Sequence, residues 1–356
     1  MELTRALWAF LNKACQEKVF PGCVFVYGRP RFRERRVIFT GLRGLTRNRE
    51  AVTKDLVYDL ASLTKVLSTT SLLMMAIDLG LIKLSTSLGA LDWEVPDDLK
   101  AVTILDLLSH RSGLPPWRPY WADQGLAQKE RLKATILRER PLFERGQGRL
   151  YSDLNFMLLG FLIEELLNDQ IAELFEEKIA KKLNLSLASF NSANLKLAPT
   201  EDGPRVGGPL DYPGLKMLGP VPLGRVHDDN AALLGGAAGH AGLFSSALDV
   251  WSIIEDWAQS QAVDQGFLVS QRTILSFLSE ASSQGRPPRA AGFDIGQGLL
   301  EGFRGHLGYS GGSFWWNPLH DKAYVLLCNR VHPTARGSKM DSFRAALNQN
   351  LIDFLT

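Results

Sequence analysis

The sequence is poor in cysteine and has no apolar run long enough to cross a membrane. Its 356 residues include three cysteines, Cys15, Cys23 and Cys328, which form no C-x-x-C pair. Such a sparse, odd set argues against a disulfide framework and fits a reducing compartment. A membrane-spanning helix needs about 20 consecutive, mostly apolar residues. No segment approaches that length, so we predict no membrane span.

The sequence also lacks an excess of charge of either sign. Lys and Arg number 40 against 38 Asp and Glu, which gives a net charge of +2, and the two signs are interspersed. This balance gives no reason to expect a nucleic-acid or anionic-membrane partner. The six histidines follow no common zinc-ligand spacing, so we expect no metal centre.

The first 20 residues predict an amphipathic helix that belongs to the fold. Apolar residues recur at helical spacing from Leu3 to Ala14, and charged residues interrupt every longer apolar run. The segment lacks the apolar core and cleavage site of a secretory signal. We therefore expect a cytoplasmic protein, or a periplasmic one if the sequence is a trimmed mature form.

The remaining pattern predicts strands near both ends of the chain and helices between them. Expected strands are residues 22–27, 36–39, 56–60, 298–303, 312–316 and 323–328, which are apolar or aromatic runs bounded by turn residues. Expected helices are residues 66–79, 104–109, 128–138, 154–167, 171–183, 247–257 and 342–355. Residues 191–225 are rich in Pro, Gly and Asn and predict a long irregular connection, which is often functional.

This order predicts an α/β (α+β) fold. An antiparallel sheet flanked by helices would be built from both ends of the chain, with a mainly helical region inserted. We assign residues 1–60 and 231–356 to the sheet domain and residues 61–230 to the helical domain.

The strongest chemical signal is the stretch Ser62-Leu63-Thr64-Lys65 at the start of an expected helix. A lysine three residues after a serine lies on the same helix face, one turn away. A serine hydroxyl needs such a neighbour to become a nucleophile. S-x-x-K is a signature of penicillin-interacting serine enzymes. About one such match is expected by chance in a chain of this length. A capping serine followed by a surface lysine is the alternative.

Three further stretches follow in order. They are VTILDLLSHRSGLPPW at residues 102–117, Tyr151-Ser152-Asp153, and His306-Leu307-Gly308. Together with S-x-x-K they resemble the serine β-lactamase-like and penicillin-binding protein family. That family includes class C β-lactamases, D,D-carboxypeptidases and esterases. Residues 224–251 resemble one branch of it. The resemblance implies a five-stranded antiparallel sheet flanked by helices, with the catalytic cleft between the sheet and a helical domain.

The resemblance also implies roles for the motif residues. Ser62 would be the acylated nucleophile. Lys65 would take part in moving the serine proton, provided that burial lowers the pKa of the lysine. Tyr151 would be a partner base or proton relay, aided by the nearby cation. The backbone N–H groups of Ser62 and Tyr309 would hold the oxyanion.

Asp153 departs from the family pattern, which has asparagine at this position. An ionised aspartate only accepts hydrogen bonds, whereas asparagine also donates. This change puts amide recognition and efficient β-lactam turnover in doubt. Substrate binding by Asp153 competes with a role as the cap of the expected helix 154–167. Gly308 would line the substrate site next to Tyr309.

The histidine of the third motif has two candidates, because His240-Ala241-Gly242 is also H-x-G. We assign the motif to His306, since a strand-like run follows it. His306 is expected opposite Ser62, contacting the carboxylate end of the substrate or tuning the Tyr151 proton, and titrating near neutrality. His240 and His227 are secondary candidates for the cleft wall, with structural hydrogen bonding at least as probable for each.

The expected function is a serine hydrolase that works through an acyl-enzyme on Ser62, without a metal or organic cofactor. The leading substrate class is a muropeptide-like peptide ending in a D-amino acid, cleaved by D,D-carboxypeptidase or peptidase chemistry. One alternative is a carboxylesterase or weak β-lactamase on the same machinery. Another is a catalytically silent penicillin-binding sensor. The oligomeric state is not predicted.

Overall fold

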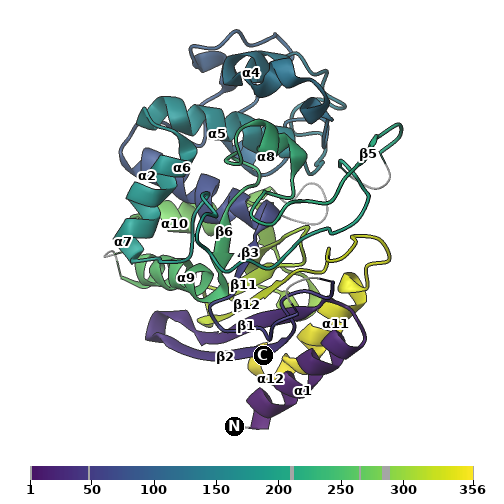
Figure 1. Ribbon diagram of the computed structural model, residues 1–356. Helices are drawn as coiled ribbons and strands as arrows, with labels where there is room; N and C mark the ends of the chain where they lie inside the picture. The colour runs from purple at the N-terminus through teal and green to yellow at the C-terminus, as the bar shows by residue number, and fades with distance from the viewer. Residues whose placement is uncertain (1, 47–48, 209–211, 264–265, 283–288, 356) are drawn as a thin grey trace.

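An antiparallel sheet of eight strands forms the base of the molecule (Figure 1). The computed structural model describes residues 2–46, 49–208, 212–263, 266–282 and 289–355. The strand order is β2-β1-β12-β11-β10-β9-β8-β7. The bounds are β1 (Gly22–Arg29), β2 (Glu34–Gly41), β7 (Glu280–Ser282), β8 (Arg289–Ala290), β9 (Asp294–Ile295), β10 (Arg304–Leu307), β11 (Ser313–Asn317) and β12 (Lys322–Cys328). Because β1 pairs with β12, both ends of the chain build the sheet, as predicted.

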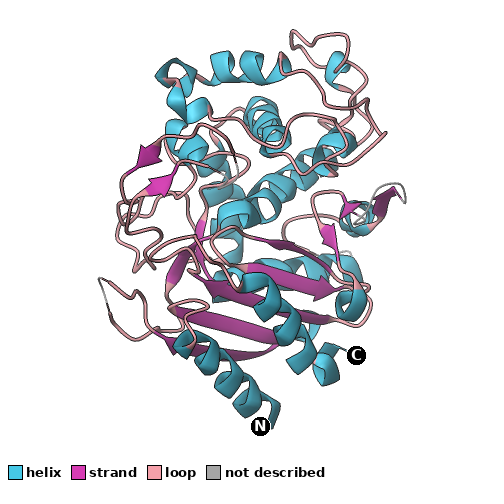
Figure 2. Cartoon of the chain, turned by 90° about the vertical axis from the view of Figure 1, so that its right-hand side faces the viewer, coloured by secondary structure: helices cyan, strands magenta, loops and turns pink. Residues whose placement is uncertain are grey.

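Helices cover both faces of this sheet, and the alternation of β1 explains why. Cys23, Phe25 and Tyr27 pack against the terminal helices, whereas Val24 and Val26 belong to the core on the opposite face. The terminal helices are α1 (Glu2–Gln16), α11 (Met340–Asn350) and α12 (Ile352–Leu355). Figure 2 shows terminal helices lying along one face of the strands. The opposite face carries α9 (Ala247–Ala262), with α10 (Gln271–Leu278) beside it.

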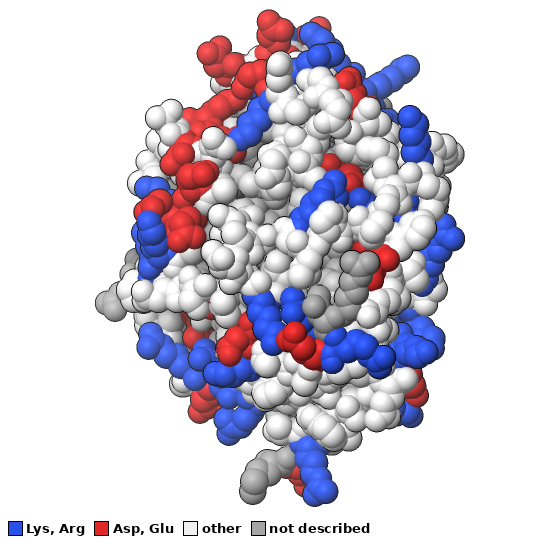
Figure 3. All heavy atoms as spheres, viewed as in Figure 1, with Lys and Arg blue, Asp and Glu red and all other residues white. Residues whose placement is uncertain are grey.

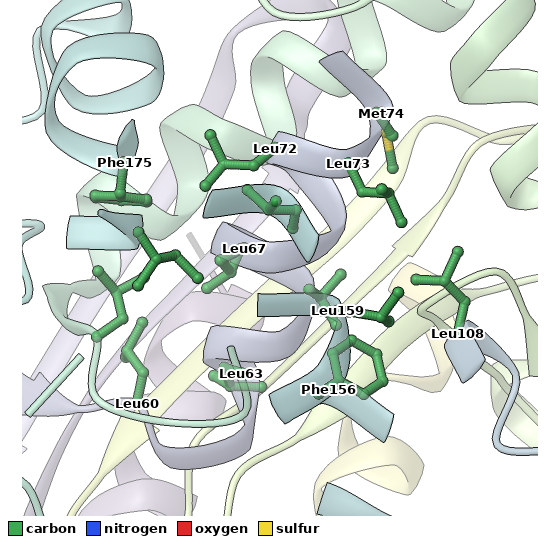
Figure 4. Packing of buried hydrophobic residues seen from close by; sticks show 14 of the residues in the cluster. Leu60, Leu63, Leu67, Leu72, Leu73, Met74, Leu108, Phe156, Leu159 and Phe175 are labelled. Carbon is green, nitrogen blue, oxygen red and sulfur yellow. The ribbon is translucent and has the colours of Figure 1, made fainter. Parts of the chain in front are cut away.

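The inserted region between the strands is mainly helical, as predicted. Its longest helix is α5 (Asp153–Leu167), which packs against α2 (Ser71–Asp78) and the turns before it. Leu63, Leu67, Phe156 and Leu159 form part of that contact and are fully buried (Figure 4). The other helices are α3 (Ile104–Leu108), α4 (Lys129–Leu137), α6 (Ile171–Phe175), α7 (Lys181–Leu183) and α8 (Asp229–Leu233).

Two small two-stranded sheets lie apart from the main sheet. Strand β3 (Val57–Asp59) pairs with β6 (Phe244–Ser246), and β4 (Arg205–Val206) pairs with β5 (Met217–Leu218). The predicted irregular connection over residues 191–225 is largely loop, with β4 and β5 as its short strands. Residues 209–211 of that prediction lie outside the described residues. The division into residues 1–60 with 231–356 and 61–230 stays a prediction, and one cluster of buried side chains extends across both parts.

Two predictions about the sheet were wrong. The sheet has eight strands where five were expected, because β7, β8 and β9 are two- or three-residue strands added beyond β10. The strand expected at residues 298–303 is a short 3₁₀ turn at Gly298–Leu300, where Gly298 has a φ of 60°. That left-handed conformation interrupts an extended strand. The strand that carries His306 begins at Arg304.

The described helices include none that combines the length and the apolar character of a membrane-crossing segment. The three cysteines are free thiols, and Cys23 lies opposite Cys328 on neighbouring strands. Both signs of charge are interspersed over the face shown in Figure 3.

Candidate active site

Ser62 lies half-buried at the start of the helix that the sequence predicted. It sits in a 3₁₀ turn, Ala61–Leu63, which leads through a π-helical turn, Lys65–Thr70, into α2. Ala61 has a φ of 47°, an unusual conformation for a residue with a side chain. Asp59 holds this bend in place by accepting a hydrogen bond from the Ala61 N–H at 2.8 Å. Backbone strain of this kind is often found beside functional groups.

Lys65 is fully buried, and its ammonium group has three acceptors. Its Nζ atom donates to Ser62 Oγ at 3.0 Å and to the His240 carbonyl at 3.0 Å, and it pairs with Asp153 Oδ1 at 2.7 Å. An ammonium has three donors and no acceptor. The surroundings of Nζ therefore match the charged form of the lysine.

The pKa of Lys65 moves in the direction opposite to the one that its proposed base role requires. Burial acts to lower the pKa of this amine, but the Asp153 carboxylate, together with Tyr151, raises it above the usual value. The ion pair with Asp153 compensates the buried charge of Lys65, so desolvation does not lower the pKa overall. The condition for the base role of Lys65, that burial lowers its pKa, is therefore not met, and Asp153 is the reason.

Tyr151 lies between two cations at the start of α5. Lys65 Nζ is 5.1 Å from the centre of its ring, and the Arg289 guanidinium carbon is 5.2 Å from it. The buried hydroxyl has no well-aligned hydrogen bond to the described residues. Burial raises the pKa of Tyr151, although the charge of Lys65 opposes that rise. A phenolate here would depend on both cations.

Asp153 is the first residue of α5 and does not cap it. Ser152 occupies the capping position, and its side chain donates to the Pro115 carbonyl. The Asp153 carboxylate is held by Lys65 instead, with about a fifth of its side chain exposed to the pocket. The capping role that the sequence suggested for Asp153 was therefore wrong.

His306 lies on β10, behind Tyr151 as seen from Ser62's pocket. It is 1% exposed, and the centre of its ring is 5.9 Å from that of Tyr151. Its Nδ1–H donates to the Leu307 carbonyl at 2.8 Å, which leaves Nε2 as an acceptor. Burial lowers the pKa of His306 to about 4. The lowered pKa of His306 differs from the expected titration near neutrality, whereas its contact with a substrate carboxylate stays a prediction.

His240 lies closer to Lys65 than His306 does. Its carbonyl accepts from Lys65, and its ring Nε2 hydrogen-bonds Asp228 Oδ1 at 3.0 Å. Asp228 also accepts from the Ala231 N–H and so caps α8. The two H-x-G histidines therefore have different positions, one behind Tyr151 and one in the wall of the pocket.

His227 and Tyr309 form another part of the wall. The backbone N–H of His227 donates to Asp59, and its ring Nε2 lies 3.0 Å from Glu201. The centre of the His227 ring is 5.6 Å from that of Tyr309. Gly308, which precedes Tyr309, allows this strand end to approach the nucleophile, because a Cβ there would lie 2.8 Å from the Leu60 carbonyl oxygen.

These groups surround a pocket of about 260 Å³. Of the predicted site residues, Ser62, Tyr151, Asp153 and Tyr309 line it, and Lys65, His306 and Gly308 do not. Its lining residues are Ala61, Ser62, Pro116, Trp117, Tyr151, Asp153, Arg205, Gly207, Gly208, His227, Asp228, Asp229, His240, Ala241 and Tyr309. Within the described ranges, no group of three or more His, Cys, Asp or Glu side chains is arranged to hold a metal ion.

Three contributors were missed as site residues: Arg205, His110 and Arg289, whose guanidinium carbon faces the Tyr151 ring. Arg205 belongs to the irregular segment, which has no periodic pattern that could place it. His110 lies within the LLSHRSGLP stretch, but its role depends on a φ of 58° that turns the chain. Its Nδ1 accepts from the Ser152 N–H at 3.0 Å, and its ring is 4.5 Å from that of Tyr151. His110 thus supports the position of Tyr151.

The Beta-lactamase family pattern matches residues 23–349, which include this whole constellation. The chain belongs to the Beta-lactamase family. A solved structure of similar fold is the D-alanine carboxypeptidase AmpC from Burkholderia cenocepacia. It has a TM-score of 0.74 and 15% identity, and the comparison covers 99% of each chain.

Two named relatives are more similar in sequence. One, from Salmonella agona, bears the name "Putative D-alanyl-D-alanine carboxypeptidase". It is 27% identical over 323 residues, which cover 81% of this chain and 73% of the relative. The other is the N-acetylmuramyl-L-alanine amidase of Bacillus subtilis, 26% identical over 304 residues that cover 77% of this chain and 68% of the relative.

Proposed function

We propose that this protein is a serine hydrolase that forms an acyl-enzyme on Ser62 and cleaves peptidoglycan-derived peptides containing D-amino acids. The observation that carries the proposal is the Lys65 ammonium, which donates to Ser62 Oγ and is held by Asp153. A cation bound directly to a serine oxygen favours the alkoxide. The names of the two relatives support the substrate class.

The acylation step follows from the charges at the site. Because Lys65 is held as an ammonium, the proposed base is Tyr151; burial opposes its phenolate form, and the charges of Lys65 and Arg289 favour it. Tyr151 accepts the Ser62 proton as Ser62 Oγ attacks the carbonyl carbon. The oxyanion is held by the N–H groups of Ser62 and Tyr309, whose residues face the same pocket. Tyr151 then returns the proton to the leaving nitrogen or oxygen, and water reverses the sequence to release the acid.

Ester hydrolysis is the second candidate, and Asp153 favours it. An amide substrate benefits from a side-chain donor to its carbonyl group, which the family's asparagine supplies. An ionised carboxylate paired with Lys65 cannot donate. Esters have a better leaving group and depend less on such contacts. The ratio of ester to amide turnover distinguishes the two candidates.

The test is covalent labelling followed by mass spectrometry. We expect a fluorophosphonate to modify Ser62 in the wild-type protein and to leave the Ser62→Ala variant unlabelled, while both unfold at similar temperatures. Hydrolysis of D-Ala-D-Ala peptides should fall to a few per cent or less in the variant. Labelling of a different residue would refute the proposal. Slow labelling by a penicillin without any turnover would favour the sensor alternative.

A further inference from the structure

The cations at the pocket are neutralised by carboxylates. Lys65 is paired with Asp153, and Arg205 makes two bonds to Asp229, at 2.6 and 2.7 Å. Arg225 adds a third bond to the same carboxylate at 2.8 Å. Both oxygens of Asp229 are therefore occupied by guanidinium groups. Among the described lining residues, the guanidinium of Arg205 thus already has a carboxylate partner.

Asp228, by contrast, presents a carboxylate oxygen that is available to a ligand. Its Oδ1 atom accepts from both the Ala231 N–H and the His240 ring. No described residue donates to its Oδ2 atom, and a quarter of the side chain is exposed. Burial acts to raise the pKa of Asp228, but His240, the Ala231 N–H and the charge of Lys65 bring it below its usual value. The carboxylate is thus ionised at neutral pH and lies in the wall of the Ser62 pocket.

His240 contacts Asp228 through a single ring atom, Nε2, which hydrogen-bonds Oδ1. The ring is fully buried, and its Nδ1 atom has no partner in the described structure. Because the contact with His240 uses only Oδ1, the Oδ2 atom of Asp228 remains for a donor from a ligand in the pocket.

Aromatic side chains complete a setting suited to a cation. Trp117, Tyr151 and Tyr309 line the same pocket as Asp228. The Trp117 ring packs edge-on against Tyr212 with their centres 4.9 Å apart, which fixes its orientation. Aromatic faces attract ammonium groups, and more strongly when water is excluded. A carboxylate beside aromatic walls is therefore complementary to a protonated amine.

We propose that Asp228 is a specificity-determining residue that binds a protonated amine of the acyl donor. The substrate would be a peptide, amide or ester of a D-amino acid with a free ammonium near the scissile carbonyl. Two sources share this chemistry: the terminal α-amine of the acyl residue, and the side-chain amine of a diamino acid. This inference rests on the proposed function, because it concerns the substrate of the Ser62 pocket.

The experiment compares three acyl donors with the wild type and Asp228→Asn. The donors are D-alanine p-nitroanilide, its N-acetyl derivative, and Nα-acetyl-D-lysine p-nitroanilide. Asparagine caps a helix about as well as aspartate and still accepts from His240, so the variant removes charge and little else. We expect wild-type kcat/KM to favour one amine donor over N-acetyl-D-alanine p-nitroanilide. In Asp228→Asn that preference should fall by roughly tenfold or more.

The three acyl donors distinguish the two sources of the amine. The labelling of Ser62 distinguishes failure of this inference from failure of the proposed function. Loss confined to D-alanine p-nitroanilide identifies the α-amine, and loss confined to the lysine derivative identifies the side-chain amine. Asp123→Asn is the matched control, because Asp123 also caps a short helix by accepting from Gly125 N–H but does not line the pocket. It should leave the preference unchanged. An equal preference in the wild type and Asp228→Asn, with Ser62 still labelled by fluorophosphonate, overturns the inference alone. Absence of Ser62 labelling in the wild type refutes the proposed function.

Discussion

At the scale of single residues, Asp153 changes what Lys65 can do. The carboxylate lies 2.7 Å from Nζ and holds the pKa of the lysine above its usual value. A neutral asparagine, as in the family pattern, would leave burial as the larger influence and lower that pKa. In the proposed mechanism, this difference moves the role of base from the lysine toward Tyr151 and leaves the proposed substrate site without the donor that asparagine would supply.

Asp153→Asn is expected to shift the pH dependence of acylation to lower pH. Without the carboxylate, the pKa of Lys65 falls, and the neutral amine becomes available as a base at lower pH than in the wild type. The ratio of amide to ester turnover should rise at the same time, because the new amide donates. Measurements of kcat/KM between pH 6 and 10 on a matched ester and amide test both the pH shift and the change in ratio. An unchanged pH profile and ratio would contradict this account.

Lys65→Ala and Tyr151→Phe are expected to be strongly non-additive. Each should slow acylation of Ser62 by several orders of magnitude, because the phenolate depends on the ammonium beside it. Residues that act as one unit lose their joint contribution when either is removed. The double variant should therefore be little slower than the worse single variant. Single-turnover acylation rates measure this, and losses that multiply would show that the two side chains act independently.

At the scale of elements, the site depends on a close contact between α5 and the loop that carries His240. A Cβ on Gly160 would lie 2.9 Å from the Gly239 nitrogen, so the loop fits only against a glycine. The Gly239 carbonyl accepts from Thr69 at 2.6 Å, and the next carbonyl, that of His240, accepts from Lys65. Two glycines thus keep a backbone acceptor in place for the ammonium.

Gly160→Ala is expected to lower both stability and activity. The added methyl group would force the loop away from α5, at a cost of about 1–3 kcal/mol. This exceeds the gain of roughly 1 kcal/mol in helix propensity. Displacing the His240 carbonyl should also reduce kcat. Gly219→Ala is the control, because nothing lies within 4 Å of its Cβ position. Thermal unfolding and kcat of both variants test this, and equal behaviour of the two would refute it.

The elements also show how far the sequence predicts this protein. Helical periodicity located α5 and the helix after Ser62, because a long apolar face has a clear period. The strands β8 and β9 have two residues each, too few to show alternation, and they were missed. Four motifs placed Ser62, Tyr151 and Asp153 at one pocket. The Lys65–Asp153 pair could not be foreseen, because it depends on where two helices begin relative to each other.

At the scale of the whole molecule, the site lies where the helical region meets the sheet. One cluster of buried residues extends from Val24 on the central sheet to Phe175 in the helical region. The sheet and the helical region therefore stabilise each other through a shared apolar core. The polar groups under Tyr151, including His110 and His306, are enclosed within this structure. Their burial connects the charge state of the site to the stability of the whole fold.

Acidification is therefore expected to destabilise the protein partly through His306. Burial lowers the pKa of this histidine to about 4, whereas an unfolded histidine has a pKa of about 6.5. Between these values the unfolded chain binds more protons than the native protein, so stability falls as pH decreases from about 6.5 to about 4. At about 1.4 kcal/mol for each pKa unit, the difference corresponds to roughly 3 kcal/mol.

The His306→Asn variant isolates this contribution. Asparagine can donate to the Leu307 carbonyl, as His306 does, but it does not titrate. Its unfolding free energy should fall by about 2 kcal/mol less than that of the wild type between pH 7 and pH 4.5. His320→Asn, which changes an exposed histidine, should follow the wild type. Denaturant unfolding at several pH values measures these slopes. Parallel pH dependence of the wild type and His306→Asn would show that His306 is not held neutral by the fold. The comparison uses slopes because His110 and the buried carboxylates remain in all three proteins and their contributions cancel.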